Sequence, residues 1–468
     1  MFKILLINSC NKKTVGHAAN DMCFPTLNLI HLATYIQQNL ENEVEIKIID
    51  AEIETPKNIK KKILSFDPSL VGISVLTPTY EEGLKIAKFI KDKTNAKIIL
   101  GNDHASFFAE KILEKRDYVD FVIKNDVGEF GFLALVKKLI KRNTSFKDIP
   151  DLVFRDKGNI ISNKLVKHPL PKIIPDLDYI KNFYETYRKN YNLQFGKFHK
   201  SKMHPMIINT IRGCSFFNNK CNYCGIYDLT MRQTSPRFFW NTVRKLNESY
   251  KINFFFEICD SFSSFPIFIE GLLKDRERIN TRKEGIEFEF YIKSLELVSN
   301  RNLISYLNAL NTTRVNIGLD SGSNTVLLKR LNKRTTVEQN TKAVEILAKN
   351  NIKIHASFVI GSYNETNEEA YKTMNYIDYI IEKFPKAFSA IELSCLIPLP
   401  GSWMWKKMMA EDKFKEKYEN EDLFDIQTLK KEWADNFTKI DFLKLKKLVD
   451  KKQEEYKTKG ISVGNNIG

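Results

Sequence analysis

The sequence predicts an α/β protein: a doubly wound, Rossmann-like parallel sheet, then a partial (β/α)6 barrel of the TIM type, then a short helical C-terminal tail. Three observations predict it. Short β-branched runs alternate with amphipathic helical patterns over the first 140 residues. A second alternating series begins at Pro205, and a proline-containing stretch separates the two. At 468 residues, the chain is also too long for one ordinary core.

The first domain is predicted over residues 1–142, with strands at 3–8, 44–51, 70–76, 97–101 and 120–125. These runs are almost continuously apolar, as in a parallel sheet buried by helices on both faces. Pro25 and Thr55-Pro56 mark helix starts. Ligands of such sheets bind at the carboxyl ends of the strands. No G-x-G-x-x-G follows the first strand and no Walker A motif occurs, so neither a nicotinamide nor a nucleoside-triphosphate site is supported.

Residues 143–204 are predicted to be an irregular linker, because they contain several prolines and a Tyr/Lys/Asn-rich stretch. The barrel is predicted over 205–404, with strands at 206–211, 253–258, 287–293, 314–319, 353–361 and 390–396. Ser235 and Pro236 are typical of a helix cap and first helical position. Residues 405–468 are expected to form a charged, mostly helical C-terminal region.

Composition sets limits on location and partners. Seven cysteines in so long a chain are not a disulfide framework, and no apolar run has the length of a signal peptide or a membrane span. We therefore expect a cytoplasmic protein without a membrane partner. The net charge of +16 is Lys-rich and often alternates with acidic residues, as on solvated helix faces, so a nucleic-acid partner is not expected.

Three cysteines lie close together in "GCSFFNNKCNYCG": Cys214, Cys221 and Cys224. Three thiolates on one loop can bind three irons of a [4Fe-4S] cluster and leave the fourth iron open. Zinc is the competing metal, but a structural zinc site needs a fourth ligand, and the loop offers neither His nor another Cys.

These cysteines, with "RG" before them and aromatic Tyr223 inside the last pair, resemble the cluster loop of the radical S-adenosylmethionine (SAM) superfamily. Later segments agree: "EICDSF" (257–262), "VNIGLDSGSNTVLLKRLNK" (315–333), "FVIGSYNET" (358–366) and "IPLPGS" (397–402) resemble that superfamily's strand motifs. With "FPTLNLIHLATYI" (24–36) and "VEIKIIDAE" near the N-terminus, residues 1–405 resemble the cobalamin-binding radical SAM subfamily.

The resemblance implies a [4Fe-4S] cluster, SAM and cobalamin as cofactors, and reductive cleavage of SAM to methionine and a 5′-deoxyadenosyl radical. The three cysteines are then both the metal ligands and the catalytic centre. The SAM contacts carried over by position are Tyr223, Asp260, Lys293, Asp320, Ser321, Ser323 and Gly361. Helix capping for Asp260, solvent exposure for Lys293 and a plain turn for Gly361 are the structural alternatives.

The resemblance places cobalamin contacts at the strand ends of the first domain: Ser74, Thr77, Gly101, Asn102, Gly128 and Glu129. Three departures from the family pattern stand out. The first cysteine gap has six residues instead of three, which we interpret as a looped-out insertion containing Asn218 and Asn219. No D-x-H-x-x-G occurs, and His17 and His104 are interpreted as loop or surface histidines. Asn102 stands where the family has a glycine.

Four functions remain open from the sequence. The first is a cobalamin-dependent radical SAM enzyme, for example one that methylates an unactivated carbon. The second is a cobalamin-independent radical SAM enzyme whose first domain is structural or binds substrate. A tRNA methylthiotransferase needs three further cysteines in the first domain, where only Cys10 and Cys23 occur; a non-enzymatic iron–sulfur scaffold is the fourth. The expected partners are a small-molecule or peptide substrate and an electron donor such as flavodoxin or ferredoxin.

Overall fold

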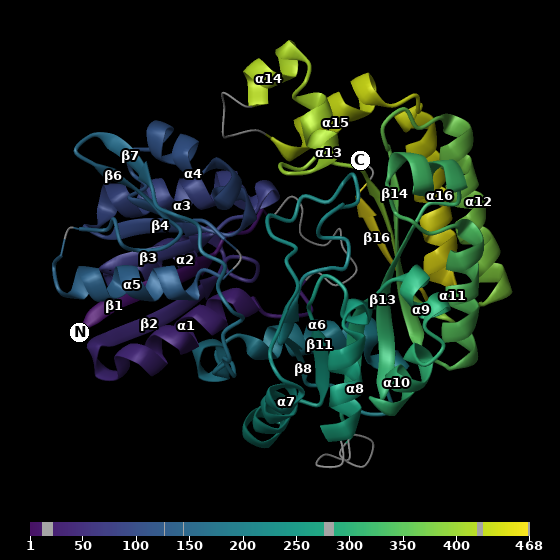
Figure 1. The fold of residues 1–468 in the computed structure, drawn as a ribbon, viewed down its shortest axis with the longest axis horizontal. Helices are drawn as coiled ribbons and strands as arrows, with labels where there is room; N and C mark the ends of the chain where they lie inside the picture. Colours follow the sequence, from purple (N-terminus) through teal and green to yellow (C-terminus); the bar gives the residue numbers. More distant parts are fainter. Residues whose placement is uncertain (12–21, 126, 144, 276–284, 419–424, 467–468) are drawn as a thin grey trace.

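Two seven-stranded sheets lie side by side in the structure, a computed structural model that describes residues 1–11, 22–125, 127–143, 145–275, 285–418 and 425–466 (Figure 1). The first sheet is built from residues 2–162 and the second from residues 205–466. The predicted α/β class, a doubly wound domain followed by a partial barrel, is confirmed.

The first sheet has the strand order β2-β1-β3-β4-β5-β6-β7. The first five strands in the chain pair in parallel: β1 (Phe2–Asn8), β2 (Val44–Asp50), β3 (Leu70–Ser74), β4 (Lys97–Gly101) and β5 (Phe121–Ile123). The order reverses between β1 and β3, and such a switch point opens a crevice at the carboxyl ends of the strands. The domain's ligand site is therefore expected there.

Five helices cover both faces of this sheet. They are α1 (Leu27–Leu40), α2 (Pro56–Phe66), α3 (Tyr80–Lys93), α4 (Asp103–Lys115) and α5 (Glu129–Ile140). Ile4 and Leu6 of β1 pack in the core formed with α1 and α5, whereas Leu5 and Ile7 pack in the core formed with α2, α3 and α4. Successive side chains of β1 therefore point into different cores, one on each face of the sheet. Both sets must be apolar, which explains the continuous apolar sequence of β1.

The prediction that residues 143–204 are irregular is wrong, because this segment contains strands and a helix. Strands β6 (Leu152–Asp156) and β7 (Asn159–Ser162) extend the first sheet antiparallel, and α6 (Tyr184–Phe195) follows. The prolines at 169, 171 and 175 lie between these elements, in a segment without regular structure. The prolines indicate irregular structure, but the "LVFRD" run before them has the alternation of a strand. Its Val153 and Phe154 are buried on opposite faces of the sheet.

The second sheet has the order β16-β15-β14-β13-β12-β11-β8, and all its pairs are parallel. Its strands are β8 (Pro205–Ile208), β11 (Phe254–Glu257), β12 (Glu287–Ile292), β13 (Thr312–Asp320), β14 (Lys353–Ile360), β15 (Phe388–Cys395) and β16 (Ser462–Asn466). The helices between them are α7 (Pro236–Tyr250), α8 (Pro266–Asp275), α9 (Ser294–Ser299), α10 (Leu303–Ala309), α11 (Val337–Lys349) and α12 (Asn367–Lys383). Because β8 and β16 are edges, the barrel stays open. The Ser235 oxygen caps α7 by accepting from Phe238 N at 3.2 Å, as predicted.

The C-terminal region is mostly helical, as predicted for 405–468, but it also contributes a strand that the sequence did not predict. After α13 (Trp403–Met408), α14 (Asp412–Tyr418), α15 (Ile426–Phe437) and α16 (Phe442–Thr458), strand β16 pairs with β15 as the last strand of the barrel sheet. Its sequence "SVGNN" is short and rich in Gly and Asn, which are unfavourable in strands. Pairing with β15 outweighs that local preference.

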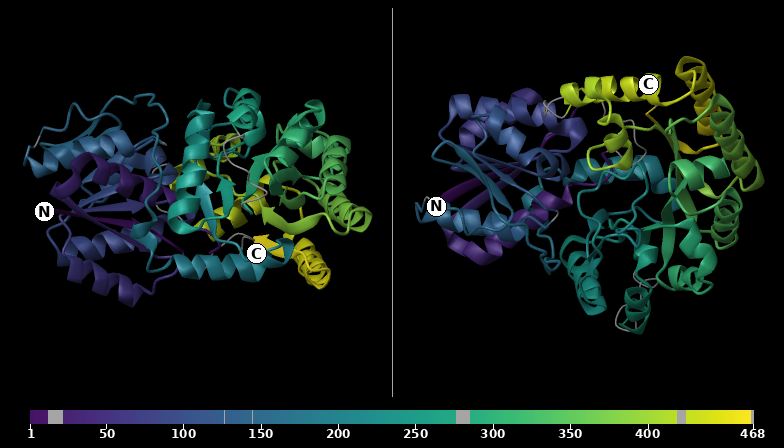
Figure 2. Two further views of the ribbon diagram at one scale, coloured as in Figure 1. Left: turned by 90° about the horizontal axis from the view of Figure 1, so that it is seen from below. Right: turned by 45° about the horizontal axis from the view of Figure 1, so that its top comes forward.

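The two domains lie next to each other (Figure 2) and share contacts between buried side chains. Tyr187 of α6 donates a hydrogen bond to Asp50 Oδ2 at 2.6 Å, and Trp405 of α13 packs against Phe108 of α4. None of the helices in the described residues combines the length and the apolar character needed to span a bilayer.

Candidate functional site between the two sheets

The cysteine loop is carried by a small hairpin at the carboxyl end of β8. Strands β9 (Ile211–Arg212) and β10 (Arg232–Gln233) pair antiparallel, and the loop runs between them. Gly213 has φ +101°, and a Cβ there would lie 2.5 Å from Thr230 O and 2.7 Å from Leu229 O. Only glycine therefore lets the two ends of the loop approach closely.

The three cysteines gather around a small apolar cluster. Cys214 is buried with Phe216 and Leu229, and Cys221 and Cys224 are partly buried against them. Turns fix the backbone: Phe217 N donates to Cys214 O at 2.9 Å, and Cys224 N donates to Cys221 O at 3.0 Å. The loop thus presents three thiols from a rigid backbone.

The donor set fits an iron–sulfur cluster better than a single ion. Within the described ranges, no three Cys, His, Asp or Glu side chains converge as ligands of one metal ion would. A cluster binds each thiolate through a different iron, so its ligands stand farther apart than the four ligands of a zinc ion.

Burial makes these thiols reluctant to ionise on their own. It raises the pKa of Cys221 above its ordinary value and that of Cys224 to about 11. Metal ligands must be thiolates, so cluster binding has to displace the protons.

The insertion in the first cysteine gap packs on the barrel rather than on the first domain. Asn332 donates to Asn219 Oδ1 at 2.8 Å and to Lys220 O at 3.0 Å. The Arg334 guanidinium lies 4.2 Å from the centre of the Phe216 ring. The insertion is thus anchored to the segment after β13, as a looped-out structure that leaves the flanking cysteines together.

Tyr223, Asp320 and Lys333 form a buried group behind the loop. The Tyr223 hydroxyl donates to Asp320 Oδ1 at 3.1 Å, and Lys333 Nζ lies 2.6 Å from Asp320 Oδ2. Burial alone would lower the pKa of Lys333, but the Asp320 carboxylate holds it well above its usual range. This group ties Asp320 to the cysteine loop; contact of Tyr223 and Asp320 with SAM remains a prediction.

Asp260 and Lys293 also contact the loop. Asp260 Oδ2 accepts from Gly213 N at 2.8 Å, next to the first cysteine. Lys293 Nζ donates to Ser215 Oγ at 2.7 Å and pairs with Glu296 at 3.2 Å. Lys293 is therefore not a solvated surface lysine, and its predicted contact with the SAM carboxylate would require it to exchange one of these partners.

The remaining predicted SAM residues have structural partners. Ser321 Oγ shares a hydrogen bond with Thr373 at 2.9 Å, and Ser323 N donates to Ser321 Oγ at 3.1 Å. Gly361 has φ +99°, and Trp433 donates to its carbonyl at 2.7 Å. The backbone conformation alone explains this glycine, so approach to adenosine stays a prediction.

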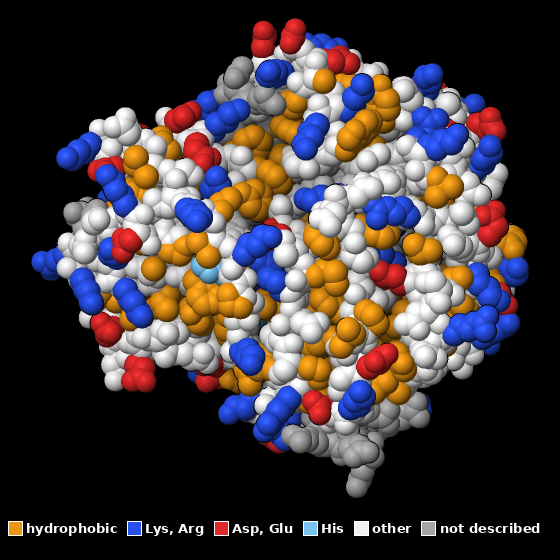
Figure 3. All heavy atoms as spheres, viewed as in Figure 1, with side chains coloured by type: hydrophobic (Ala, Val, Ile, Leu, Met, Phe, Trp, Pro, Cys, Tyr) orange, Lys and Arg blue, Asp and Glu red, His pale blue; other side chains and the backbone are white. Residues whose placement is uncertain are grey.

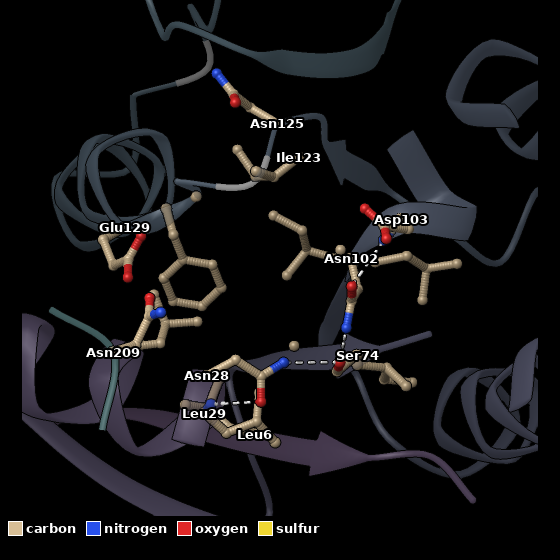
Figure 4. A pocket seen from close by; sticks show the side chains of 18 of the residues that line it. Leu6, Asn28, Leu29, Ser74, Asn102, Asp103, Ile123, Asn125, Glu129 and Asn209 are labelled. Carbon is tan, nitrogen blue, oxygen red and sulfur yellow. Dashed lines mark hydrogen bonds between the residues drawn. The ribbon is translucent and has the colours of Figure 1, made fainter. Parts of the chain in front are cut away.

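A cavity of about 380 Å³ opens between the two domains, at the switch point of the first sheet (Figure 4). Apolar side chains line its inner part, including Leu6, Leu29 and Phe132. The barrel contributes Asn209, Arg212, Ile226, Asp228, Ile258 and Asp260. Ile226 lies two residues after Cys224, so one cavity connects the first domain to the cysteine loop.

Five of the six predicted cobalamin contacts line this cavity: Ser74, Gly101, Asn102, Gly128 and Glu129. A Cβ on Gly101 would meet no atom within 4 Å, so this residue leaves open space for a ligand. Thr77 is not among the lining residues; its hydroxyl lies 3.1 Å from His104 Nδ1 instead. The lining combines apolar side chains with several polar groups, as is usual for a cofactor site.

Asn102 takes the conformation of the glycine it replaces, with φ +83° and ψ 179°. Its amide donates to Ser74 Oγ at 3.0 Å, and its oxygen accepts from Asp103 N at 2.8 Å. Asn28 of α1 donates to the same Ser74 Oγ at 3.0 Å, as Figure 4 shows. The side chain therefore joins a polar ring at the cavity mouth.

Six polar residues that line the cavity were not among our predicted contacts: Asn28, Asp103, Asn125, Asn209, Arg212 and Asp228. Asn28 and Arg212 lie within quoted motifs and could have been found there; Asn209 and Asp228 carried no sequence signal. The interpretation of His104 as a surface residue is wrong, because it is buried between Tyr80 and Phe108. His17 lies outside the described residues.

Two models of known families match this chain, one in each of its two domains. Residues 208–377 match the Radical SAM superfamily, and residues 18–129 match the B12 binding domain. The first range contains the cysteine loop, and the second contains all six predicted cobalamin contacts.

The individual relatives have low sequence identity to this chain, but their matches cover most of it. The chain is 26% identical over 435 residues to an uncharacterized methyltransferase, PH0819, of Pyrococcus horikoshii, covering 88% of this chain and 84% of that one. Its fold is similar to the radical SAM methyltransferase TsrM from Kitasatospora setae, solved with cobalamin and a [4Fe-4S] cluster (TM-score 0.66, 14% identity, 88% and 75% coverage). It is also similar to OxsB, a cobalamin-dependent SAM radical enzyme solved with aqua-cobalamin and SAM (TM-score 0.61, 17% identity, 98% and 62% coverage).

Proposed function

This chain belongs to the B12-binding radical SAM enzyme family, with a [4Fe-4S] cluster, SAM and cobalamin as its cofactors, and from that premise we propose that it methylates an unactivated carbon of a small-molecule or peptide substrate. The shared cavity is the observation that carries the proposal. Strand ends of the first domain and residues next to the cysteine loop line one space, so a corrinoid there would lie beside the SAM site. The similarity to PH0819 and TsrM, both named as methyltransferases, supports methyl transfer.

In this proposal Cys214, Cys221 and Cys224 would hold three irons of the cluster and leave the fourth for SAM. Reductive cleavage of SAM to methionine and a 5′-deoxyadenosyl radical, and the carrying of a methyl group, are the chemistry that the bound cofactors supply. The chain's own residues hold and orient them. Asp260 and the Tyr223–Asp320–Lys333 group brace the loop from two sides, and the inner wall of the cavity excludes water.

The decisive experiment is anaerobic reconstitution with iron, sulfide and hydroxocobalamin, followed by SAM and dithionite. We expect the protein to retain corrinoid absorbance and to form two products from SAM. These are 5′-deoxyadenosine, from reductive cleavage, and S-adenosylhomocysteine, from methyl transfer. Formation of 5′-deoxyadenosine without any retained corrinoid would contradict the proposal and favour cobalamin-independent radical chemistry.

Gly101→Leu provides the matched variant. Its side chain would project into the open space beside Gly101, so corrinoid should be lost. The cysteine loop lies in the other domain, so cluster absorbance and reductive SAM cleavage should remain. Equal corrinoid binding in both proteins would show that the cofactor does not occupy this cavity.

A further inference from the structure

Three chain segments come together at the surface beside the cysteine loop, and Asn222 links them. Asn222 N donates to Leu331 O at 2.9 Å and its side chain donates to Arg330 O at 2.7 Å, while Met404 N donates to Asn222 O at 3.0 Å. Asn222 itself stands between two of the three cysteines. We call residues 215–222, 328–334 and 402–408 the basic loop surface.

The basic loop surface contains cations and no acidic residue. Its three segments carry Lys220, Lys329, Arg330, Lys333, Arg334, Lys406 and Lys407, and no Asp or Glu. Arg330 pairs with Glu369 and Lys333 with Asp320. The other five make no ion pair to any side chain that the structure describes, and two of them, Lys329 and Lys406, are exposed.

Exposed apolar side chains lie among these cations. Phe217 at the tip of the insertion is 40% exposed, Leu328 46% and Trp403 43%. Apolar groups surrounded by charge are typical of a protein-binding surface. Figure 3 shows Lys and Arg outnumbering Asp and Glu over the central loops of this face, below α13.

We propose that the basic loop surface is the docking site of a small acidic protein that carries single electrons on a flavin or an iron–sulfur group. This proposal rests on the proposed function, since it assigns the partner of the same metal site. One electron would pass from the reduced carrier to the protein-bound cluster, which leaves the carrier oxidised by one electron and breaks no bond. The hydrogen bonds of Asn222 connect the docking residues directly to the backbone of the ligand loop.

The surface explains the wide first cysteine gap. The inserted residues leave Phe217 exposed, Arg334 donates a hydrogen bond to Asn219 O, and the bonds from Asn332 anchor the insertion. A three-residue gap would lack this projection. Charge complementarity selects an acidic carrier, because opposite potentials speed encounter and fix orientation.

The test is the double variant Lys329→Glu/Lys406→Glu in the reconstituted holoenzyme, with flavodoxin as the probe. Both lysines are exposed and make no ion pair among the described residues. The control Lys61→Glu/Lys88→Glu makes the same change of charge at two exposed sites of α2 and α3. The readouts are the Kd for flavodoxin, the rate of cluster bleaching by reduced flavodoxin, and the rate with dithionite, a small anion that needs no docking surface.

We expect the first variant to bind flavodoxin more weakly and to be reduced by it more slowly, each by at least about tenfold at low ionic strength. The difference from the unsubstituted protein should become smaller as the salt concentration rises. Dithionite reduction and the control variant should be unchanged. If the control variant loses as much flavodoxin binding, the effect comes from net charge alone. If the first variant is reduced equally slowly by dithionite, the two lysines have a structural role. Either result overturns the proposal. Unchanged flavodoxin binding with a raised substrate KM would assign the surface to an acidic substrate instead. Failure of the proposed function is separate: the unsubstituted protein would bind flavodoxin yet form no 5′-deoxyadenosine with dithionite.

Discussion

At the scale of single residues, the three cysteines of the loop differ from the other four in their surroundings. Cys214, Cys221 and Cys224 share one small cluster, whereas Cys10, Cys23, Cys259 and Cys395 are dispersed through the larger cores and their edges. Position in the fold, and not burial alone, therefore separates candidate ligands from structural thiols.

Replacing any one of the three with serine should remove the cluster. The serine hydroxyl is a poor iron ligand, and the remaining two thiolates cannot hold the cluster alone. Iron content is expected to fall from about four per chain to near zero, with loss of the charge-transfer absorbance. Cys23→Ser is the control, since a hydroxyl can keep the bond to Gln194; full cluster content in a ligand variant would contradict the assignment.

Asn102 offers a second test at this scale. Its backbone lies in a region that only glycine adopts easily, at a cost of about 1–3 kcal/mol. Asn102→Gly should raise the midpoint of urea unfolding by the equivalent of about 1 kcal/mol, since glycine caps a helix almost as well. Asn102→Ala should lower it, because alanine keeps the strain and loses both side-chain hydrogen bonds. A lower midpoint for Asn102→Gly than for the unsubstituted protein would mean that the lost hydrogen bonds outweigh the relief of strain.

At the scale of elements, the turn after β14 depends on a buried carboxyl group. Glu365 Oε2 accepts hydrogen bonds from Gly361 N, Ser362 N and Ser362 Oγ at 2.7–2.9 Å. Its other oxygen, buried, has no hydrogen-bond partner among the described residues. Burial raises the pKa of Glu365 from 4.5 to about 7.

This pKa predicts a loss of stability as the pH rises. The stabilising effect of the protonated carboxyl is fully present below pH 4.5 and disappears as the pH rises through 7. The free energy of unfolding should therefore fall by up to about 3 kcal/mol between pH 5 and pH 8, relative to Glu365→Gln. The comparison isolates this group from Glu257, whose pKa burial raises to about 8. Parallel pH profiles for both proteins would place the pKa of Glu365 near its ordinary value.

At the scale of the whole molecule, α6 connects the two domains. Its Tyr187 donates to Asp50 at the end of β2, whereas its Tyr184 donates to Pro205 O at the start of the barrel, at 3.0 Å. One face of this short helix thus fixes the first sheet against the second. The shared cavity exists only while that arrangement holds.

Tyr187→Phe should loosen the domain arrangement. It leaves a buried carboxylate oxygen without its donor, which costs about 1–3 kcal/mol. Urea unfolding should begin at lower concentration, and proteolysis between residues 163 and 204 should be faster. Tyr184→Phe, with a neutral acceptor, is the matched control and should cost less. Equal effects would mean that the Asp50 bond does not hold the domains together.

The sequence by itself determined that there are two sheets, where most of their strands lie along the chain, and the cysteine loop. These features follow from local patterns: apolar runs of strand length, helix caps at Thr55 and Ser235, and cysteines close in sequence. It did not predict β6, β7 or β16: β6 and β16 depend on pairing with strands distant in sequence, and β7 only continues the sheet through its hairpin with β6. Only the tertiary structure decided which strand ends meet. The cavity shared by Asn28 and Arg212, the buried partners of Asp320, and the surface around Asn222 all join residues far apart along the chain, and no local pattern encodes such distances.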